Sequence, residues 1–199
     1  MQFIAWSICS KPARLAAIAL LSVTSLPAFT RGVQAEQIPQ VPPELDQLAY
    51  FEGTWRCEQP ADSLAFESVA LTWLVERDLN NFWYVGYAEE MTSISNPNPV
   101  NSREFLGYDA AARHFVRMAA VGNGNLLNLT SSGWQGEQLT WEGTVTVEDQ
   151  AIFLRQIITQ ESENQFSATY FILDDVSHEW QPVVNETCER QAQAPSTAE

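Results

Sequence analysis

Two arginines with apolar neighbours are the side chains in this sequence best suited to bind a ligand. With the period of two along a β-strand, Arg117 shares a face with Phe115, and Arg155 shares a face with Phe153. A guanidinium inside an apolar barrel can hold a carboxylate through two parallel hydrogen bonds. Alternatively, each arginine points outward or pairs with one of the many acids, because charged side chains are rarely buried unpaired. We predict that Arg117 or Arg155 anchors an acidic head group.

Large aromatic side chains are spread over the segments that read as strands. They are candidate walls for an apolar pocket, which needs only a few polar anchors. The predicted walls are Trp73, Trp83, Tyr84, Trp141, Phe153 and Tyr170.

Motifs of covalent and metal catalysis are missing from the sequence. It has no Gly-x-Ser-x-Gly elbow, His-Glu-x-x-His, Cys-x-x-Cys, phosphate-binding glycine loop or calcium loop. His178 lies among acids in the segment 174–179, which could bind a cation loosely but reads more simply as a solvated turn. We therefore expect no enzyme, no metal site and no cofactor.

The first thirty-five residues have the layout of a secretory signal. They contain Lys11, Arg14 and Arg31, no acid, and an apolar run over 15–29 that is short for a membrane span. Small residues before a cut after Ala35 complete the pattern, and an uncleaved N-terminal anchor is the alternative. The expected division is a signal peptide 1–35, an extended segment 36–44, one domain 45–190 and a disordered tail 191–199. We predict export to the periplasm or the medium, with no membrane span after cleavage.

Charge and cysteine content fit an exported protein. All 25 acids lie after residue 35, where arginine is the only basic residue type and occurs seven times. Such an acidic chain repels phosphate backbones, which argues against nucleic acid as a partner. Cys57 and Cys188 are the cysteines that remain after cleavage, and an even pair in an exported domain predicts a disulfide. Two buried free thiols are the alternative.

The domain reads as all-β. Segments rich in β-branched and aromatic residues alternate with turn signals, as between Gly122 and Asn125, and a short helix is expected over 43–50. Sequential hairpins without crossover helices favour a single antiparallel up-and-down barrel, because closure removes exposed edges. Ten strands are predicted, at 52–58, 66–77, 81–92, 103–109, 113–121, 125–131, 137–147, 151–160, 164–173 and 182–190.

Motifs at both ends of the domain resemble those of calycins, the lipocalins and their relatives. In these proteins a Gly-x-Trp on the first strand is covered by an arginine from the last strand, and this chain has Gly53–Trp55 and Cys188–Arg190. With Leu45 and Leu48 before the first motif and Gly107–Asp109 mid-chain, the pattern is similar to the bacterial domain-of-unknown-function family 1579. That family has no settled activity. The resemblance implies a calycin barrel and names no ligand.

Strand pairing gives a separate argument for the same closure. In a barrel with an even number of strands, the first and last strands are antiparallel neighbours, so opposite residues have a constant index sum. If Cys57 faces Cys188, then Trp55 faces Arg190 on the same side of the sheet. The arginine would then stack on the indole.

Three functions follow from this fold. The leading hypothesis is an exported carrier or binding module for a small apolar or amphipathic ligand. A structural or protein-interaction barrel with a filled interior is the second. The third is a lipid-modifying or haem-binding barrel; nitrobindins, which are ten-stranded calycins, bind haem through one histidine near the C-terminal end, whereas the strand histidine here is His114.

Overall fold

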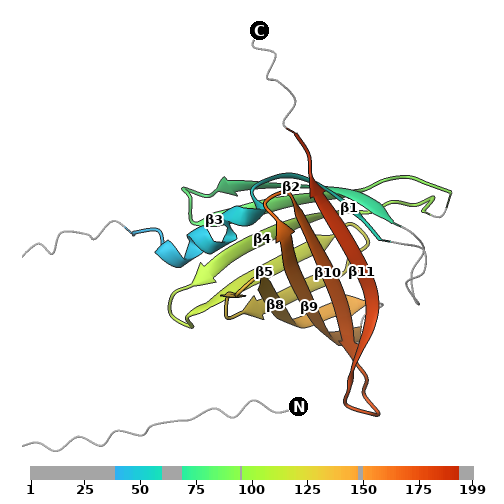
Figure 1. Ribbon diagram of the computed structural model, residues 1–199. Coiled ribbons are helices and arrows are strands. Elements are labelled where there is room, and N and C mark those ends of the chain that lie inside the picture. The colour runs from blue at the N-terminus through green and yellow to red at the C-terminus, as the bar shows by residue number, and fades with distance from the viewer. Residues whose placement is uncertain (1–38, 60–68, 95, 148–149, 193–199) are drawn as a thin grey trace, which may run out of the picture. The chain divides into compact units, whose positions relative to one another are not determined.

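The computed structural model describes residues 39–59, 69–94, 96–147 and 150–192 (Figure 1). The predicted signal peptide, residues 36–38 of the predicted extended segment and residues 193–199 of the predicted tail lie outside the described residues. Within the described ranges, no helix is both long and apolar enough to cross a membrane.

A short 3-10 helix, η1 (Pro43–Phe51), leads into the strands, with a proline at its start, where a missing N–H costs no hydrogen bond. The strands agree with the predicted segments to within a few residues, apart from one extra two-residue strand. They are β1 (Gly53–Glu58), β2 (Ala70–Asp78), β3 (Trp83–Glu90), β4 (Asn101–Asp109), β5 (His114–Val121), β6 (Leu126–Ser131), β7 (Trp134–Gln135), β8 (Gln138–Val147), β9 (Gln150–Ser162), β10 (Gln165–Leu173) and β11 (Trp180–Arg190).

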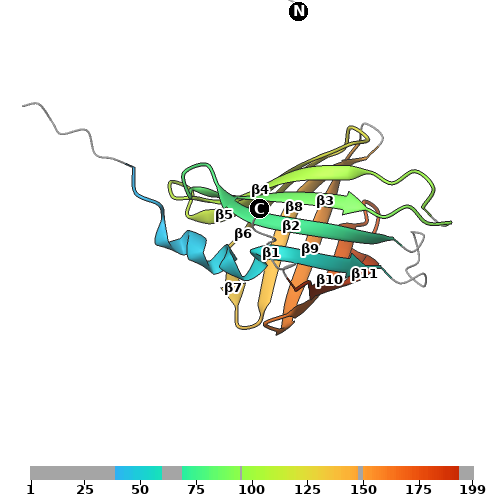
Figure 2. The same cartoon turned by 90° about the horizontal axis from the view of Figure 1, so that it is seen from above.

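Ten antiparallel strands close into a barrel (Figures 1 and 2). Successive strands pair from β1 to β6 and from β8 to β11, β1 pairs with β11, and β6 pairs with β8. The extra strand β7 pairs with the start of β8, and β6 pairs with its later half. These pairings confirm the predicted all-β, antiparallel up-and-down barrel with a short N-terminal helix.

Gly143 permits the closure between β6 and β8. A Cβ atom at this position would overlap the backbone carbonyl oxygen of Asn128 and crowd the Cα atom of Leu129 on β6. Only a residue without a side chain lets the two strands approach this closely. The glycine within the alternating pattern of β8 thus marks the closing contact.

The helix η1 lies at one end of the barrel (Figure 2), and its apolar side chains pack there with aromatic residues of the core. Leu45, Leu48 and Phe51 of η1 are at most 1% exposed, and Trp55 is fully buried beside them. Trp55 donates its indole N–H to the Phe51 carbonyl at 2.8 Å. This apolar plug leaves only the opposite part of the interior for a ligand.

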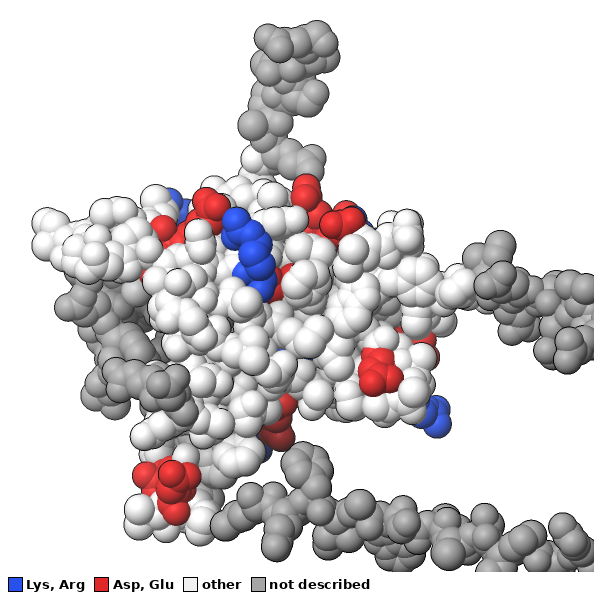
Figure 3. Space-filling view, turned by 180° about the vertical axis from the view of Figure 1, so that it is seen from behind, with Lys and Arg blue, Asp and Glu red and all other residues white. Residues whose placement is uncertain are grey.

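Most acidic side chains of the described residues are exposed at the outer surface. Figure 3 shows one face on which acidic groups are scattered and basic groups are few. After residue 35 the chain has 25 acidic residues and only seven arginines, so most acids have no arginine available as a counter-ion. This distribution is typical of a soluble surface that repels other anions.

The seam between β1 and β11 has the predicted register. Trp55 pairs with Arg190 and Cys57 pairs with Cys188. The cysteines form a disulfide with Cα atoms 4.0 Å apart, slightly below the usual 4.4–6.8 Å range. Directly opposite residues in a non-hydrogen-bonded antiparallel pair already lie about 4.5 Å apart, which accounts for the short spacing.

Arg190 ties this seam to the start of the barrel. Its guanidinium carbon lies 4.2 Å from the centroid of the Trp55 ring. The same side chain donates hydrogen bonds to the backbone carbonyls of Tyr50 (2.7 Å), Glu163 (3.2 Å) and Glu52. One side chain therefore joins η1, β1, the β9–β10 turn and β11.

Arg190→Ala should lower the free energy of unfolding by about 2–4 kcal/mol, because it removes an indole stack and three charge-assisted hydrogen bonds. Urea denaturation measures the loss. Arg56→Ala is the matched control, since Arg56 is an exposed arginine on the same seam, and a change within about 0.5 kcal/mol is expected. Equal effects of the two substitutions would contradict a structural role for Arg190.

Candidate functional site

A partly enclosed cavity of about 210 Å³ occupies the interior beyond Trp55, on the side away from η1. Its wall is built by strands β1 to β5 and β9 to β11. Its apolar side chains include Leu71, Trp73, Ile158 and Phe166, and the Cys57–Cys188 disulfide forms part of the same wall. A pocket of this size is smaller than the roughly 300–1,000 Å³ that drug-sized ligands occupy.

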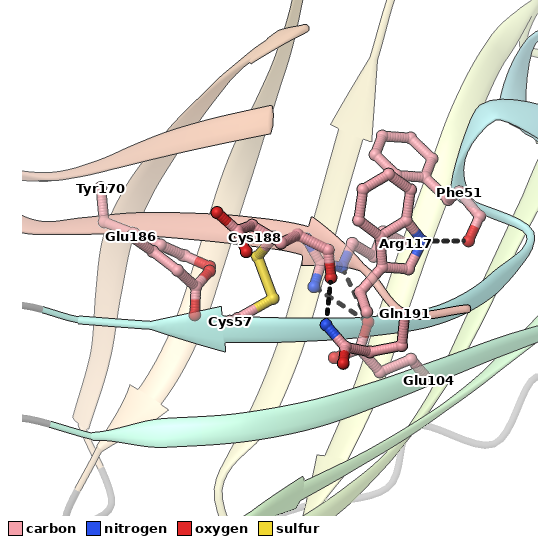
Figure 4. Close-up of a disulfide and its surroundings, with 10 residues drawn as sticks. Phe51, Cys57, Glu104, Arg117, Tyr170, Glu186, Cys188 and Gln191 are labelled. Atoms are coloured by element: carbon pink, nitrogen blue, oxygen red, sulfur yellow. Dashed lines mark hydrogen bonds and ion pairs between the residues drawn. A yellow bond between two sulfur atoms is a disulfide. The ribbon is translucent and has the colours of Figure 1, made fainter. Parts of the chain in front are cut away.

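An ion pair inside the barrel forms one side of the cavity (Figure 4). Arg117 on β5 is 8% exposed and lies 2.9 Å from the Oε2 atom of Glu104 on β4, which is 6% exposed. Arg117 also donates a 2.6 Å hydrogen bond to Oε1 of Gln156 on β9, and its guanidinium carbon lies 5.5 Å from the Trp73 ring centroid. The charge of Arg117 is thus already balanced inside the protein.

Burial and nearby charge act in opposite directions on Arg117. Burial is the largest single effect and lowers the pKa of the guanidinium. The acidic groups around it, Glu104 first, together outweigh burial and raise the pKa of Arg117 above its ordinary value. Arg117 is therefore a permanent cation, and Glu104 is its counter-ion.

A second acid, Glu186 on β11, lies next to the disulfide (Figure 4). Glu186 is 6% exposed and accepts a 3.0 Å hydrogen bond from the Tyr170 hydroxyl on β10. Burial raises the pKa of Glu186, opposed by hydrogen bonds from Tyr170 and Gln59 and by the charge of Arg117. Burial also raises the pKa of Tyr170, and the charge of Glu186 adds to that increase. Tyr170 thus stays a neutral donor to the carboxylate.

Five of the eight predicted ligand-binding side chains face the interior. Arg117, Trp73 and Tyr170 line the cavity. Tyr84 and Trp141 are fully buried in the apolar core and do not line the cavity. The cavity therefore has fewer aromatic walls and more polar groups than the sequence suggested.

The expectation that Trp83 and Phe153 line the interior is wrong, since both lie on the outer wall, and of the two predictions for Arg155 the alternative holds, in which it points outward and pairs with an acid. Phe153 is 55% exposed. Arg155 pairs with Glu142 at 2.6 Å and stacks 4.2 Å from the Trp180 ring centroid. Arg155 therefore cannot anchor a ligand inside the barrel.

Strands that are apolar on both faces explain these misplacements. On β9 the inward positions are Leu154, Gln156 and Ile158, so the polar Gln156 faces the core while the apolar Phe153 and Ile157 face out. On β3, Trp83 lies outside against Gly107, where any side chain would collide with the indole. Hydrophobicity alone does not distinguish the two faces of such strands.

His114 and the segment around His178 were the other polar candidates. His114 precedes Phe115, and Phe115, Arg117 and Ala119 face inward, so His114 faces out of the barrel. In the 174–179 segment, Asp174 accepts hydrogen bonds from the backbone N–H groups of Val176 and Ser177, which makes it a capped turn.

Three buried polar residues of the cavity were not predicted from the sequence: Glu104, Gln156 and Glu186. For Glu186 a signal exists, because it lies two residues before Cys188 and so shares the inward face of that cysteine. For Glu104 and Gln156 the sequence offers no such signal, because only their contacts with Arg117 in the folded barrel show that they are buried.

Comparisons with known proteins support the fold. No family model matches the chain, and no curated protein matches it. Among solved structures, Rv2717c from M. tuberculosis is similar with a TM-score of 0.55 and 12% identity, covering 77% of this chain and 100% of that chain. A redesigned β-barrel aligns at 10% identity over 73% of this chain and 96% of that chain, with a TM-score of 0.39. The chain thus shares the closed antiparallel β-barrel fold of Rv2717c.

Arg117→Met should lower the free energy of unfolding by about 3–5 kcal/mol, because it leaves Glu104 buried without a counter-ion. Adding Glu104→Leu removes the unpaired charge and should recover at least half of the loss. Urea denaturation of the double-mutant cycle measures both effects.

Arg155→Met is the matched control for this cycle. It breaks the partly exposed pair with Glu142 and should cost less than about 1 kcal/mol. Equal losses from Arg117→Met and Arg155→Met would contradict a buried, charge-compensated pair.

Glu186→Gln should stabilise the protein at neutral pH and have little effect below about pH 4. Burial raises the pKa of Glu186 in the folded state above the unfolded value of about 4.3, so wild type loses stability as the pH rises and Glu186 ionises. The groups facing Glu186 are Tyr170, Gln59, Arg117 and Glu104. Urea unfolding between pH 4 and 8 measures the difference, and parallel profiles of variant and wild type would contradict it.

Proposed function

We propose that this protein is an exported binding or carrier barrel for a small amphipathic molecule. The observation that carries the proposal is the cavity of about 210 Å³, which combines an apolar wall with fixed polar groups. Surplus interior space is rare in close-packed domains, and concave sites with a few convergent polar groups are typical of ligand binding. The small volume favours a compact ligand over a long-chain lipid.

The filled-barrel alternative has partial support. The half of the interior next to η1 is packed with Phe51, Trp55, Tyr84 and Trp141. That packing ends at the buried polar residues Arg117, Glu104 and Glu186. In a purely structural barrel, close-packed apolar residues at these positions would be equally or more stabilising. The buried polar groups are better explained as part of a binding site.

Haem binding through His114 has no support from the geometry. A haem iron held within the barrel needs an axial ligand that points inward, and His114 faces out. A lipid-modifying activity likewise has no Ser–His or Cys–His pair among the described cavity residues, where Glu104 pairs with Arg117 and Glu186 accepts a hydrogen bond from Tyr170.

Export is part of the proposal. The basic start, the apolar run over 15–29 and the small residues before Glu36 support it, together with the Cys57–Cys188 disulfide. N-terminal sequencing of protein recovered from the periplasm or the medium should read from Glu36 or within a few residues of it. Intact Met1 in a cytosolic pool would contradict export.

Binding is tested by NMR titration with small phenyl-containing compounds that differ in their head group: an amine, an alcohol and a carboxylate. At least one should shift the indole N–H resonance of Trp73 with a dissociation constant between micromolar and millimolar. Ser102→Phe fills the cavity and should abolish the shift. Thr72→Phe, on the exposed face of β2, is the control and should leave it intact. If none of the compounds binds, the proposal fails.

A further inference from the structure

Negatively charged side chains outnumber positively charged ones in the lining of the cavity. Its lining contains three carboxylates, on Glu90, Glu104 and Glu186, and a single basic residue, Arg117. Arg117 lies 2.9 Å from Glu104, so these two charges compensate each other. Glu186 is influenced by the charge of Arg117 but forms no ion pair with it, and Glu90 forms none within the described part of the lining, so the net charge of the lining is negative.

Glu186 has both the position and the capacity to bind a ligand. It is 6% exposed, lines the cavity and lies on the same face of β11 as Cys188. The hydroxyl of Tyr170 donates to Oε2, and Gln59 donates a second hydrogen bond. An ionised carboxylate offers about four acceptor positions, so further donors can be accommodated.

Glu90 lies at the rim, where its position is fixed by the segment before β4. Its Oε2 atom accepts hydrogen bonds from the Asn96 side chain and from the Val100 backbone N–H, both at 3.0 Å. These bonds hold a negative charge next to the cavity. A ligand approaching Glu186 passes through a region whose uncompensated charge is negative.

Aromatic rings complete the environment of this carboxylate. Trp73, Phe166 and Tyr170 line the same cavity as Glu186. Aromatic faces attract cations, and the attraction is strongest where water is excluded. An anionic head group, by contrast, would meet two uncompensated carboxylates and an arginine that already has its counter-ion.

We infer that the cavity selects a small organic cation, namely a primary or secondary amine in its protonated form. The ammonium group donates to Glu186 among the aromatic rings, and the apolar part of the amine packs against Leu71 and Ile158. This inference rests on the proposed binding function and reverses the charge of the head group expected from the sequence. Arg117 acts in it as the counter-ion of Glu104, which prevents a third uncompensated carboxylate in the cavity.

The test compares three ligands of nearly equal size: 2-phenylethylamine, 2-phenylethanol and 3-phenylpropanoate. Isothermal titration calorimetry with the exported protein at pH 7 gives their affinities. The amine should bind at least tenfold more tightly than the alcohol, and the carboxylate should bind most weakly, because a charge-assisted hydrogen bond is about twice as strong as a neutral one. Comparable affinities of the alcohol or the carboxylate would overturn the inference and leave the binding function intact.

Two variants locate the selectivity. Glu186→Gln should reduce the affinity for the amine at least tenfold and change the affinity for the alcohol less than threefold. Glu189→Gln, on the exposed face of the same strand, should change neither. Retained amine selectivity in a folded Glu186→Gln protein would overturn the assignment to Glu186. If that variant does not fold, the affinities of the three ligands for the wild-type protein decide whether the cavity selects a cation. If the wild-type protein binds none of the three ligands, the proposed binding function itself is refuted.

Discussion

The pairing of β1 with β11 determines which side chains enter the barrel. The Cys57–Cys188 bond fixes the register of this pair, and a shift by one residue would turn every side chain of one strand to the opposite face. Because Cys188 faces inward, Glu186 does too, and its carboxylate lies next to the disulfide. The composition of the cavity is therefore a consequence of the seam, which Arg190 reinforces by stacking on Trp55.

Local patterns were sufficient to predict the strands and their order. Period-two alternation on β8, the turn residues after Val121 and the absence of crossover helices each predicted a hairpin meander, and the two cysteines predicted how it closes. These features depend on residues that are neighbours in the sequence, or on the constant sum of residue numbers across one antiparallel strand pair. The same relation predicted the contact between Trp55 and Arg190 without reference to any relative.

The interior polar groups could not be predicted in this way. Arg117, Glu104 and Gln156 come from β5, β4 and β9, and each looks like a surface residue until the three are brought together. On β9 the polar residue faces the core and Phe153 faces solvent, which reverses the usual assignment. Burial of a polar residue is favourable only when its partners are present, and those partners are set by the closed barrel rather than by any single strand.

The disulfide also makes the barrel wall a covalent ring. It joins residues 131 positions apart, and all the turns from β2 to β10 lie between them. A tension applied to the two chain ends would pass from Cys57 through the sulfur atoms to Cys188 and would bypass the hairpins. A single cut in any of those turns would leave the two pieces attached to each other. Such a ring confers a resistance to mechanical load and to nicking that strand pairing alone does not provide.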